Sequence, residues 1–144
     1  MPLISVTRLR VRSFLYLPEF LWDTFRSARQ AQRSCGFLGG RLLVNPTLVF
    51  WTMTAWQDES AMNAYRTGGA HRKAMPKLLN WCDEAAVVHW NQESPEIPDW
   101  QQAQKHMTEK GKLSKVNHPS AVQASKQIPV PRLSRIAQTL KPAR

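Results

Sequence analysis

LVFWTMTAW, residues 48–56, is the stretch that decides the fold of this 144-residue chain. Its aromatic and β-branched residues predict a strand. In an antiparallel sheet with one face in water, apolar and polar residues alternate along each strand. Both alternating sets here are instead apolar or nearly so, with Leu48, Phe50, Thr52, Thr54 and Trp56 on one side and Val49, Trp51, Met53 and Ala55 on the other. We therefore expect this strand to be covered on both faces.

The segments around this strand complete a pattern of strands and helices. Asp58 is placed to cap a following helix, with Glu59 in its first turn, and Gly68-Gly69 breaks that helix. The other expected elements are strands at 3–12, 37–44 and 85–90 and helices at 18–35 and 70–81. The order β-α-β-β-α-β predicts a ferredoxin-like α+β unit, an antiparallel four-stranded sheet with two helices on one face.

The helices of such a unit cover only one face of its sheet. Nothing else in residues 1–92 is available for the other face, so we expect a second copy to pack there, sheet to sheet, across a two-fold axis. In the alternative, the C-terminal segment folds back over the open face. We assign residues 1–92 to a dimeric α+β barrel domain and residues 93–144 to a Pro-containing linker and a basic, largely disordered tail.

The positive charge of the chain is concentrated in that tail. Residues 1–100 contain 11 basic and 9 acidic side chains, a net charge of +2, whereas residues 101–144 contain 9 basic and 1 acidic, a net charge of +8. All tryptophan, phenylalanine and tyrosine residues lie at or before Trp100. The tail therefore lacks the aromatic side chains that stack on bases, and nucleic-acid binding is not expected.

Other classes of protein are also excluded. No apolar run approaches the roughly 20 residues of a membrane span, and the first residues lack the continuous apolar segment of a secretory signal. Cys35 and Cys82 lie in separate segments without metal-site spacing, which indicates two reduced thiols. We therefore expect a cytoplasmic protein.

Residues 50–76, FWTMTAWQDESAMNAYRTGGAHRKAMP, resemble the antibiotic-biosynthesis-monooxygenase-like family of dimeric α+β barrel proteins. The shared features are a strand ending in Trp56, an acidic helix start, an apolar stripe, a small-residue break and a His-Arg pair. The N-terminal half is similar to the spheroidene-monooxygenase-like branch and to uncharacterised relatives. The resemblance implies a homodimer with a small-molecule pocket between the sheet and helices of each subunit. Members include small oxygenases that use no metal or flavin, haem-degrading proteins and proteins without known activity.

The resemblance also raises haem as an alternative ligand. Haem-degrading members carry a histidine on the second helix, at the position that corresponds here to Met75. His71 comes about one turn too early. We therefore expect no cofactor, with haem held by His71 or His89 as the alternative.

His71 is the best candidate for a catalytic group. It follows the Gly-Gly break and precedes Arg72, at a helix start near the expected pocket. A neutral imidazole can take a proton from a phenol or enol, and Arg72 would stabilise the anion while it reacts with oxygen. A surface or capping histidine is the competing interpretation, and His89 is expected to be a packed or edge residue.

Four aromatic side chains are expected to line the pocket, namely Trp22, Trp56, Tyr65 and Trp81. Packing in the core or at a dimer interface is the alternative. Successive side chains of a strand point to opposite faces. Trp51 and Trp56 are an odd number of residues apart, so they cannot face the same pocket. The sequence thus predicts a monooxygenase-like protein that oxidises a small hydrophobic or aromatic substrate. The alternative is a non-catalytic dimer of the same fold that binds a small molecule or haem.

Overall fold

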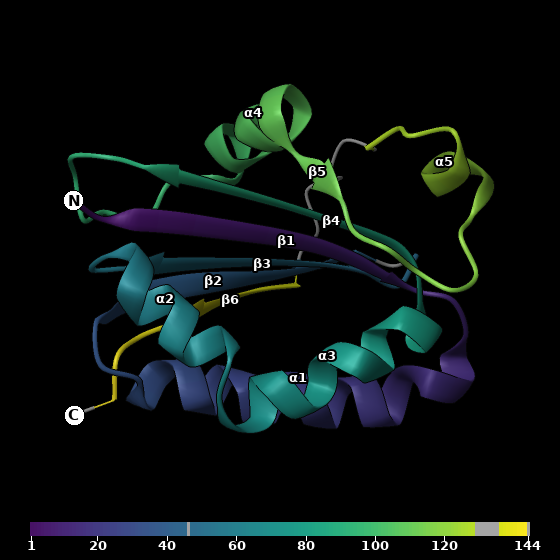
Figure 1. Cartoon of the computed structure of the whole chain (residues 1–144), viewed down its shortest axis with the longest axis horizontal. Coiled ribbons are helices and arrows are strands. Elements are labelled where there is room, and N and C mark those ends of the chain that lie inside the picture. The colour runs from purple at the N-terminus through teal and green to yellow at the C-terminus, as the bar shows by residue number, and fades with distance from the viewer. Residues whose placement is uncertain (46, 129–135, 144) are drawn as a thin grey trace.

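The computed structural model describes residues 1–45, 47–128 and 136–143. Its centre is an antiparallel sheet in the order β5-β4-β1-β3-β2-β6 (Figure 1). The strands are β1 (Leu3–Val11), β2 (Phe37–Asn45), β3 (Val49–Trp56), β4 (Cys82–Asn91), β5 (Lys112–Leu113) and β6 (Ile136–Leu140). The helices are η1 (Phe14–Tyr16, a 3₁₀ turn), α1 (Leu17–Arg33), α2 (Glu59–Arg66), α3 (Gly69–Trp81), α4 (Trp100–Lys110) and α5 (Ala121–Ala124).

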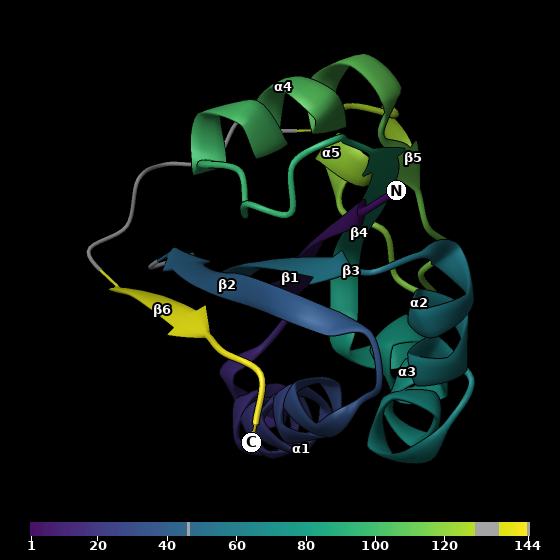
Figure 2. The same cartoon turned by 90° about the vertical axis from the view of Figure 1, so that its left-hand side faces the viewer.

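The inner strands β4-β1-β3-β2 and the helices between them form the ferredoxin-like unit, so the predicted fold class is confirmed. β1 lies at the centre and pairs antiparallel with both β3 and β4. Helices α1, α2 and α3 lie together on one side of the sheet, and α4 and α5 lie on the other (Figures 1 and 2). The helix after β3 is divided at Gly68 into α2 and α3, as the glycine pair predicted.

Local sequence signals set the ends of these helices. Pro18 stands in the first turn of α1, where its missing N–H leaves no hydrogen bond unmade. The side chain of Asp58 accepts a hydrogen bond of 2.8 Å from the backbone N–H of Ala61, which caps α2. The same kind of cap starts α4, where Asp99 accepts from Gln102 N at 2.8 Å.

The two faces of the inner sheet differ in chemistry. One side, here called the packed face, carries Ile4, Val6, Trp51, Met53 and Val88 in a continuous apolar cluster. The other side, the cavity face, carries Ser5, Thr7, Thr52, Thr54 and Trp56 and looks toward α1, α2 and α3. β3 is thus buried on both faces, as its two apolar sets predicted.

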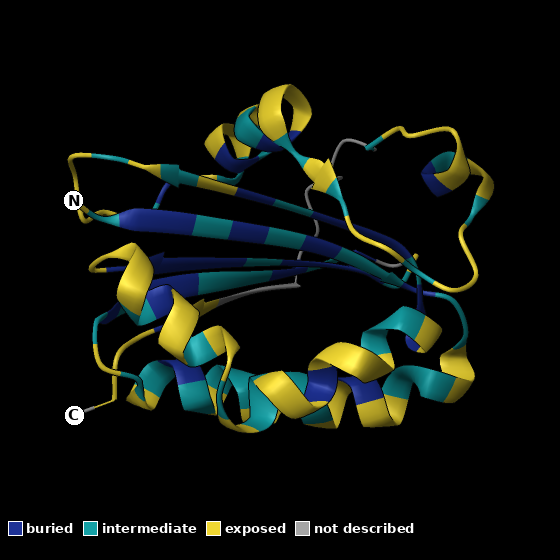
Figure 3. Cartoon of the chain, in the orientation of Figure 1, coloured by how far each residue is buried: buried dark blue, intermediate teal, exposed yellow. Residues whose placement is uncertain are grey.

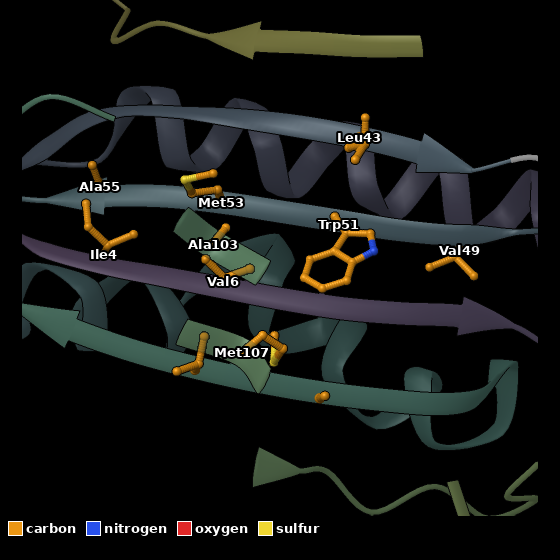
Figure 4. Close-up of a cluster of buried hydrophobic side chains, with 11 residues drawn as sticks. Ile4, Val6, Leu43, Val49, Trp51, Met53, Ala55, Ala103 and Met107 are labelled. Carbon is orange, nitrogen blue, oxygen red and sulfur yellow. The ribbon is translucent and has the colours of Figure 1, made fainter. Parts of the chain in front are cut away.

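The packed face is covered by α4 of the same chain, which is the alternative in which the C-terminal segment folds back over the open face. α4 lies within residues 93–144, which were assigned to a linker and a largely disordered tail. Ala103 and Met107 of α4 are fully buried in the cluster of the packed face (Figure 4). Trp100 meets Trp51 edge to face with ring centroids 6.5 Å apart. The physical reason is that Trp100, Ala103 and Met107 lie on one side of α4 and pack against the apolar side chains of this face. Residues 129–135 and 144 of the predicted tail lie outside the described part of the chain.

Polar contacts fix the segment after α4 on the same side. Arg8 donates to Glu84 at 2.7 Å in a buried ion pair, and the hydroxyl of Ser120 donates to the other oxygen of Glu84 at 2.8 Å. The side-chain amide of Gln123 in α5 bonds the backbone of Ala85 in β4. None of the helices in the described part of the chain has both the length and the apolar character that a membrane crossing requires.

Candidate functional site

A cavity of about 230 Å³ lies between the cavity face of the sheet and helices α1, α2 and α3. Its lining contains most of the aromatic and imidazole side chains that the sequence singled out. Ligand pockets in proteins usually measure about 300–1,000 Å³, so this volume lies just below that range. The space therefore suits a compact organic molecule.

The floor of the cavity is a set of small hydroxyl side chains. Thr54 faces Ser5 across the β1–β3 pair, and Thr52 faces Thr7 in the next pair on the same side. All four residues line the cavity. The hydroxyl of Thr54 accepts a hydrogen bond of 2.9 Å from the indole N–H of Trp56, which fixes that ring as a wall. Sequence reasoning missed this floor because threonine in an apolar strand looks like a β-branched core residue.

His71 lies in the first turn of α3 and lines the cavity, as predicted. Burial is the main cause that lowers the pKa of His71 below the ordinary 6.5, so its ring is neutral at pH 7. Nδ1 lies 3.3 Å from the backbone carbonyl oxygen of Arg66. A proton on Nδ1 satisfies that carbonyl and leaves the lone pair on Nε2 available as a base.

Gln30 of α1 holds the backbone around His71 in place. Its amide NH₂ donates to the carbonyl oxygens of Tyr65 at 3.0 Å and Gly68 at 2.9 Å, and its Oε1 accepts from the backbone N–H of His71 at 2.8 Å. The junction needs glycine at position 69, where φ is +56° and a Cβ would lie 3.0 Å from the Gln30 amide carbon. Gln30 is thus a positioning residue that no local motif revealed, because its partners lie more than 30 residues away in the sequence.

Tyr65 forms the wall beside His71. Its ring lies 4.7 Å from the imidazole and 5.0 Å from the indole of Trp56, centroid to centroid. Its hydroxyl donates to the carbonyl oxygen of Ser27 at 3.2 Å. Burial raises the pKa of the phenol well above its ordinary value, so Tyr65 stays neutral and does not compete with His71 as a base.

Two predicted site residues lie outside the cavity. Arg72 follows His71 but its side chain is exposed and is not among the lining residues; Arg66, at the end of α2, lines the cavity in its place. Trp22 is 60% exposed and stacks on Phe25 on the outer side of α1. Neighbouring residues in a helix point about 100° apart, so Trp22 faces away while Asp23 and Thr24 face inward. Trp56, Tyr65 and Trp81 line the cavity as predicted.

His89 was expected to be a packed or edge residue, with a role as haem ligand only in the alternative, and it lines the cavity. It lies on β4, in register with Ser5 of β1, and its side chain reaches the rim of the cavity. Burial is the main cause that lowers its pKa, and the positive charge of Arg66 adds to the effect. The alternation of β4 puts His89 on the cavity face with Val87, which is the signal that the sequence carried.

His71 and His89, the two residues named as alternative haem ligands, both line the cavity, and haem binding stays a prediction. Among the described residues there is no group of three or more His, Cys, Asp or Glu side chains that could hold a metal ion.

Comparison with solved structures places this geometry in a known fold. A conserved protein from Methanosarcina mazei matches with a TM-score of 0.57 at 12% identity, over 65% of this chain and 94% of its own. A candidate antibiotic biosynthesis monooxygenase from Nitrosomonas europaea matches with a TM-score of 0.58 at 14% identity, over 65% of this chain and 92% of its own. SnoaB, a cofactor-independent oxygenase from Streptomyces nogalater, matches with a TM-score of 0.54 at 17% identity, over 68% of this chain and 98% of its own.

This chain has the antibiotic biosynthesis monooxygenase fold. No family model matches its sequence, and no curated protein does. The solved structures named above share this fold with the chain at 12–17% sequence identity. The Nitrosomonas structure is matched over nearly all of its length, but 35% of this chain has no counterpart in it.

Proposed function

We propose that this protein is a monooxygenase-like enzyme that oxidises a small hydrophobic or aromatic substrate in the cavity, without a resident cofactor. The observation that carries the proposal is His71, a neutral imidazole that lines an otherwise largely apolar cavity and is held there by Gln30. The description of SnoaB as a cofactor-independent oxygenase supports it by likeness of fold.

The side chains that line the cavity determine which substrates it can bind. Trp56 and Tyr65 offer flat apolar surfaces on which a planar ring can stack. The hydroxyls of the floor offer a few donors and acceptors that orient a polar substituent, which is the usual composition of a small-molecule site. The cavity volume of about 230 Å³ favours a compact substrate.

The proposed chemistry begins with a proton transfer to Nε2 of His71. The substrate carries an acidic CH₂ group beside a phenol or enol, and loss of its proton gives a delocalised anion that is rich enough in electrons to react with O₂. Arg66 at the rim takes the role first assigned to Arg72 and stabilises the anion. The reaction is balanced as CH₂ plus O₂ giving C=O plus H₂O, so the substrate supplies all four electrons and no external reductant is needed.

Oxygen uptake tests this proposal. A panel of phenols, hydroquinones and polycyclic substrates with a CH₂ group should yield one or more that consume O₂ with the purified protein. His71→Ala should lower the rate by about 10²–10⁴-fold, the usual contribution of a general base. His106→Ala, on α4 at the opposite side of the sheet, is the matched control and should keep the rate. Uptake that survives in His71→Ala would refute the role of His71, and no uptake with any substrate that binds would refute the enzyme.

Assembly and compartment complete the proposal. We infer a cytoplasmic protein because Cys35 and Cys82 are both free thiols, and the pKa of Cys82 is raised by burial to about 12, which keeps it unreactive. The homodimer stays a prediction. A dimer packed sheet to sheet on the packed face would require α4 to leave that face. Light scattering on the full chain should therefore give the mass of a dimer that is joined through another surface, and the mass of a monomer would refute the homodimer.

A further inference from the structure

The outer side of η1 and α1 carries exposed apolar side chains that neither the core nor the cavity uses. Five large residues are each between 46% and 85% exposed, namely Phe14, Leu15, Leu21, Trp22 and Phe25. Their spacing is helical, so they form one row, here called the outer stripe, and α1 shows its exposed residues in yellow in Figure 3. Contiguous exposed apolar surface of this kind marks an interaction site more often than single exposed residues do.

Positive charge lies beside the outer stripe, at its C-terminal end. α1 contributes Arg26, Arg29 and Arg33, and the guanidinium of Arg29 lies 5.7 Å from the ring centre of Phe25. The two long helices of this layer, α1 and α3, contain six basic and two acidic residues, a net charge of +4. Of the two acids, Asp23 is paired with Lys77 at 3.1 Å, and Glu19 is exposed.

We propose that the outer stripe binds the surface of an anionic lipid membrane, with the aromatic side chains in the interface and the arginines among the headgroups. This combination of an apolar row with Trp and Phe beside Arg is that of helices that lie in the plane of a membrane surface. The negative cytoplasmic leaflet attracts such basic segments. The inference stands on this surface alone and does not depend on the catalytic proposal.

A second copy of the chain fits this surface less well. Two faces that each carry a net positive charge repel one another when they meet. The stripe is the outward side of a single helix and its preceding turn, and the same helix carries Arg26, Arg29 and Arg33 in every copy. Lipid phosphates, by contrast, complement both the apolar and the basic part of the surface.

Vesicle binding with the full chain tests the proposal. Vesicles of phosphatidylcholine alone are compared with vesicles of equal parts phosphatidylcholine and phosphatidylglycerol in a flotation assay. Binding is expected to the anionic vesicles and to fall with added salt. Trp22 is the one exposed tryptophan in the described residues, so lipids brominated in their acyl chains should quench its fluorescence selectively. Trp22→Phe should abolish most of that quenching and keep the binding.

Two sets of variants separate the apolar and the charged contributions. The triple change Leu15→Ser, Trp22→Ser and Phe25→Ser should reduce binding to anionic vesicles at least tenfold, and these positions are exposed, so the fold is kept. Arg26→Gln with Arg29→Gln should reduce binding by about fivefold per arginine, from the ~1 kcal/mol of each basic residue near a lipid surface. Lys105→Gln with Lys110→Gln removes the same charge from α4 on the far side of the sheet and should leave binding nearly unchanged.

Each outcome decides the matter. Binding that is lost in the triple variant and kept in the α4 control supports the proposal. No binding to anionic vesicles, or equal loss in the two charge variants, overturns it. A concentration-dependent dimer in sedimentation that the triple variant dissociates would assign the outer stripe to a second copy and would also overturn it.

Discussion

On the packed face of the sheet, Val6, Trp51 and Met53 meet the side of α4 that carries Ala103 and Met107, and apolar atoms fill the space. On the cavity face of the same strands, hydroxyl side chains look into a hollow beneath α1, α2 and α3. The same alternation along β1 and β3 produces both surfaces. The difference teaches that one side of each strand supplies stability, while the other leaves room for a ligand and for the group that acts on it.

Removing the same atoms from the packed face and from the helix side of the cavity is expected to give the largest contrast. Met53→Ala on the packed face should lower the free energy of unfolding by about 2–5 kcal/mol, because it opens a hole in a filled core. Met62→Ala in α2 should have a smaller effect, about 2 kcal/mol or less, because the equally buried Met62 already borders the cavity and has fewer partner atoms to lose. Urea unfolding of both variants measures the two changes.

Met107→Ala is the control for this comparison. Met107 and Met62 both lie in helices, so the change in helix propensity from methionine to alanine is the same at both positions. It should resemble Met53→Ala more than Met62→Ala. If Met62→Ala destabilises the protein as much as Met107→Ala does, the hollow is filled in solution and the contrast between the faces fails.

Two single substitutions between valine and threonine, one on each face, should differ by an intermediate amount in the free energy of unfolding. Val6→Thr puts a hydroxyl among apolar side chains and should lower the free energy of unfolding by about 1–3 kcal/mol. Thr52→Val removes a hydroxyl from the cavity floor and should change stability by less than ~1 kcal/mol. Thermal unfolding of the two variants measures these effects, and binding of a phenolic ligand should weaken in Thr52→Val alone.

The opposite ranking would be informative. A Thr52→Val variant that loses more stability than Val6→Thr would mean that the Thr52 hydroxyl is a structural hydrogen-bond partner and not a free group of the floor.

The smallest expected contrast is in the dependence of stability on pH. Burial lowers the pKa of His71, so the unfolded chain binds a proton at higher pH than the folded chain does. The stabilisation is complete above about pH 6.5 and is lost as the pH falls below that value toward the folded pKa. The slope is at most ~1.4 kcal/mol per pH unit for one histidine, and less here because the ring is partly in water.

His106 on the packed side provides the comparison for His71. Its ring stacks on Trp90 with centroids 3.8 Å apart, and its pKa is also lowered first by burial, with Glu109 opposing the shift. Denaturation at pH 7.5 and 5.5 should show that His71→Gln flattens the pH dependence more than His106→Gln does. A larger effect of His106→Gln would show that the cavity leaves His71 more open to water than the structure indicates.

The strands and helices were accessible from sequence because their signals are local. The two apolar sets of residues 48–56, the cap at Asp58 and the break at Gly68 each act within a few residues and each appear in the structure. The position of Trp56 on the cavity side, with Trp51 on the other, followed from alternation alone. His71 was placed beside the cavity by the same local logic.

The remaining features depend on contacts between distant segments. The role of Gln30 cannot be predicted from α1 alone, because its hydrogen-bond partner His71 belongs to α3, which packs beside α1 in the folded chain. Arg66 and Arg72 stand on either side of the break between α2 and α3, and the path of the chain through that break decides which one reaches the cavity. The covering role of α4 was only the alternative to a second copy, because the apolar side of α4 is short and the sequence does not show which face it meets.

The position of α4 in the chain has a consequence for synthesis on the ribosome. β4 completes the inner sheet at Asn91, but the helix that shields the packed face ends at Lys110. At about 5–20 residues per second, the intervening residues take about one to four seconds to make. During that interval a nascent sheet emerging from the exit tunnel presents an uncovered apolar surface to chaperones and to its neighbours on the polysome.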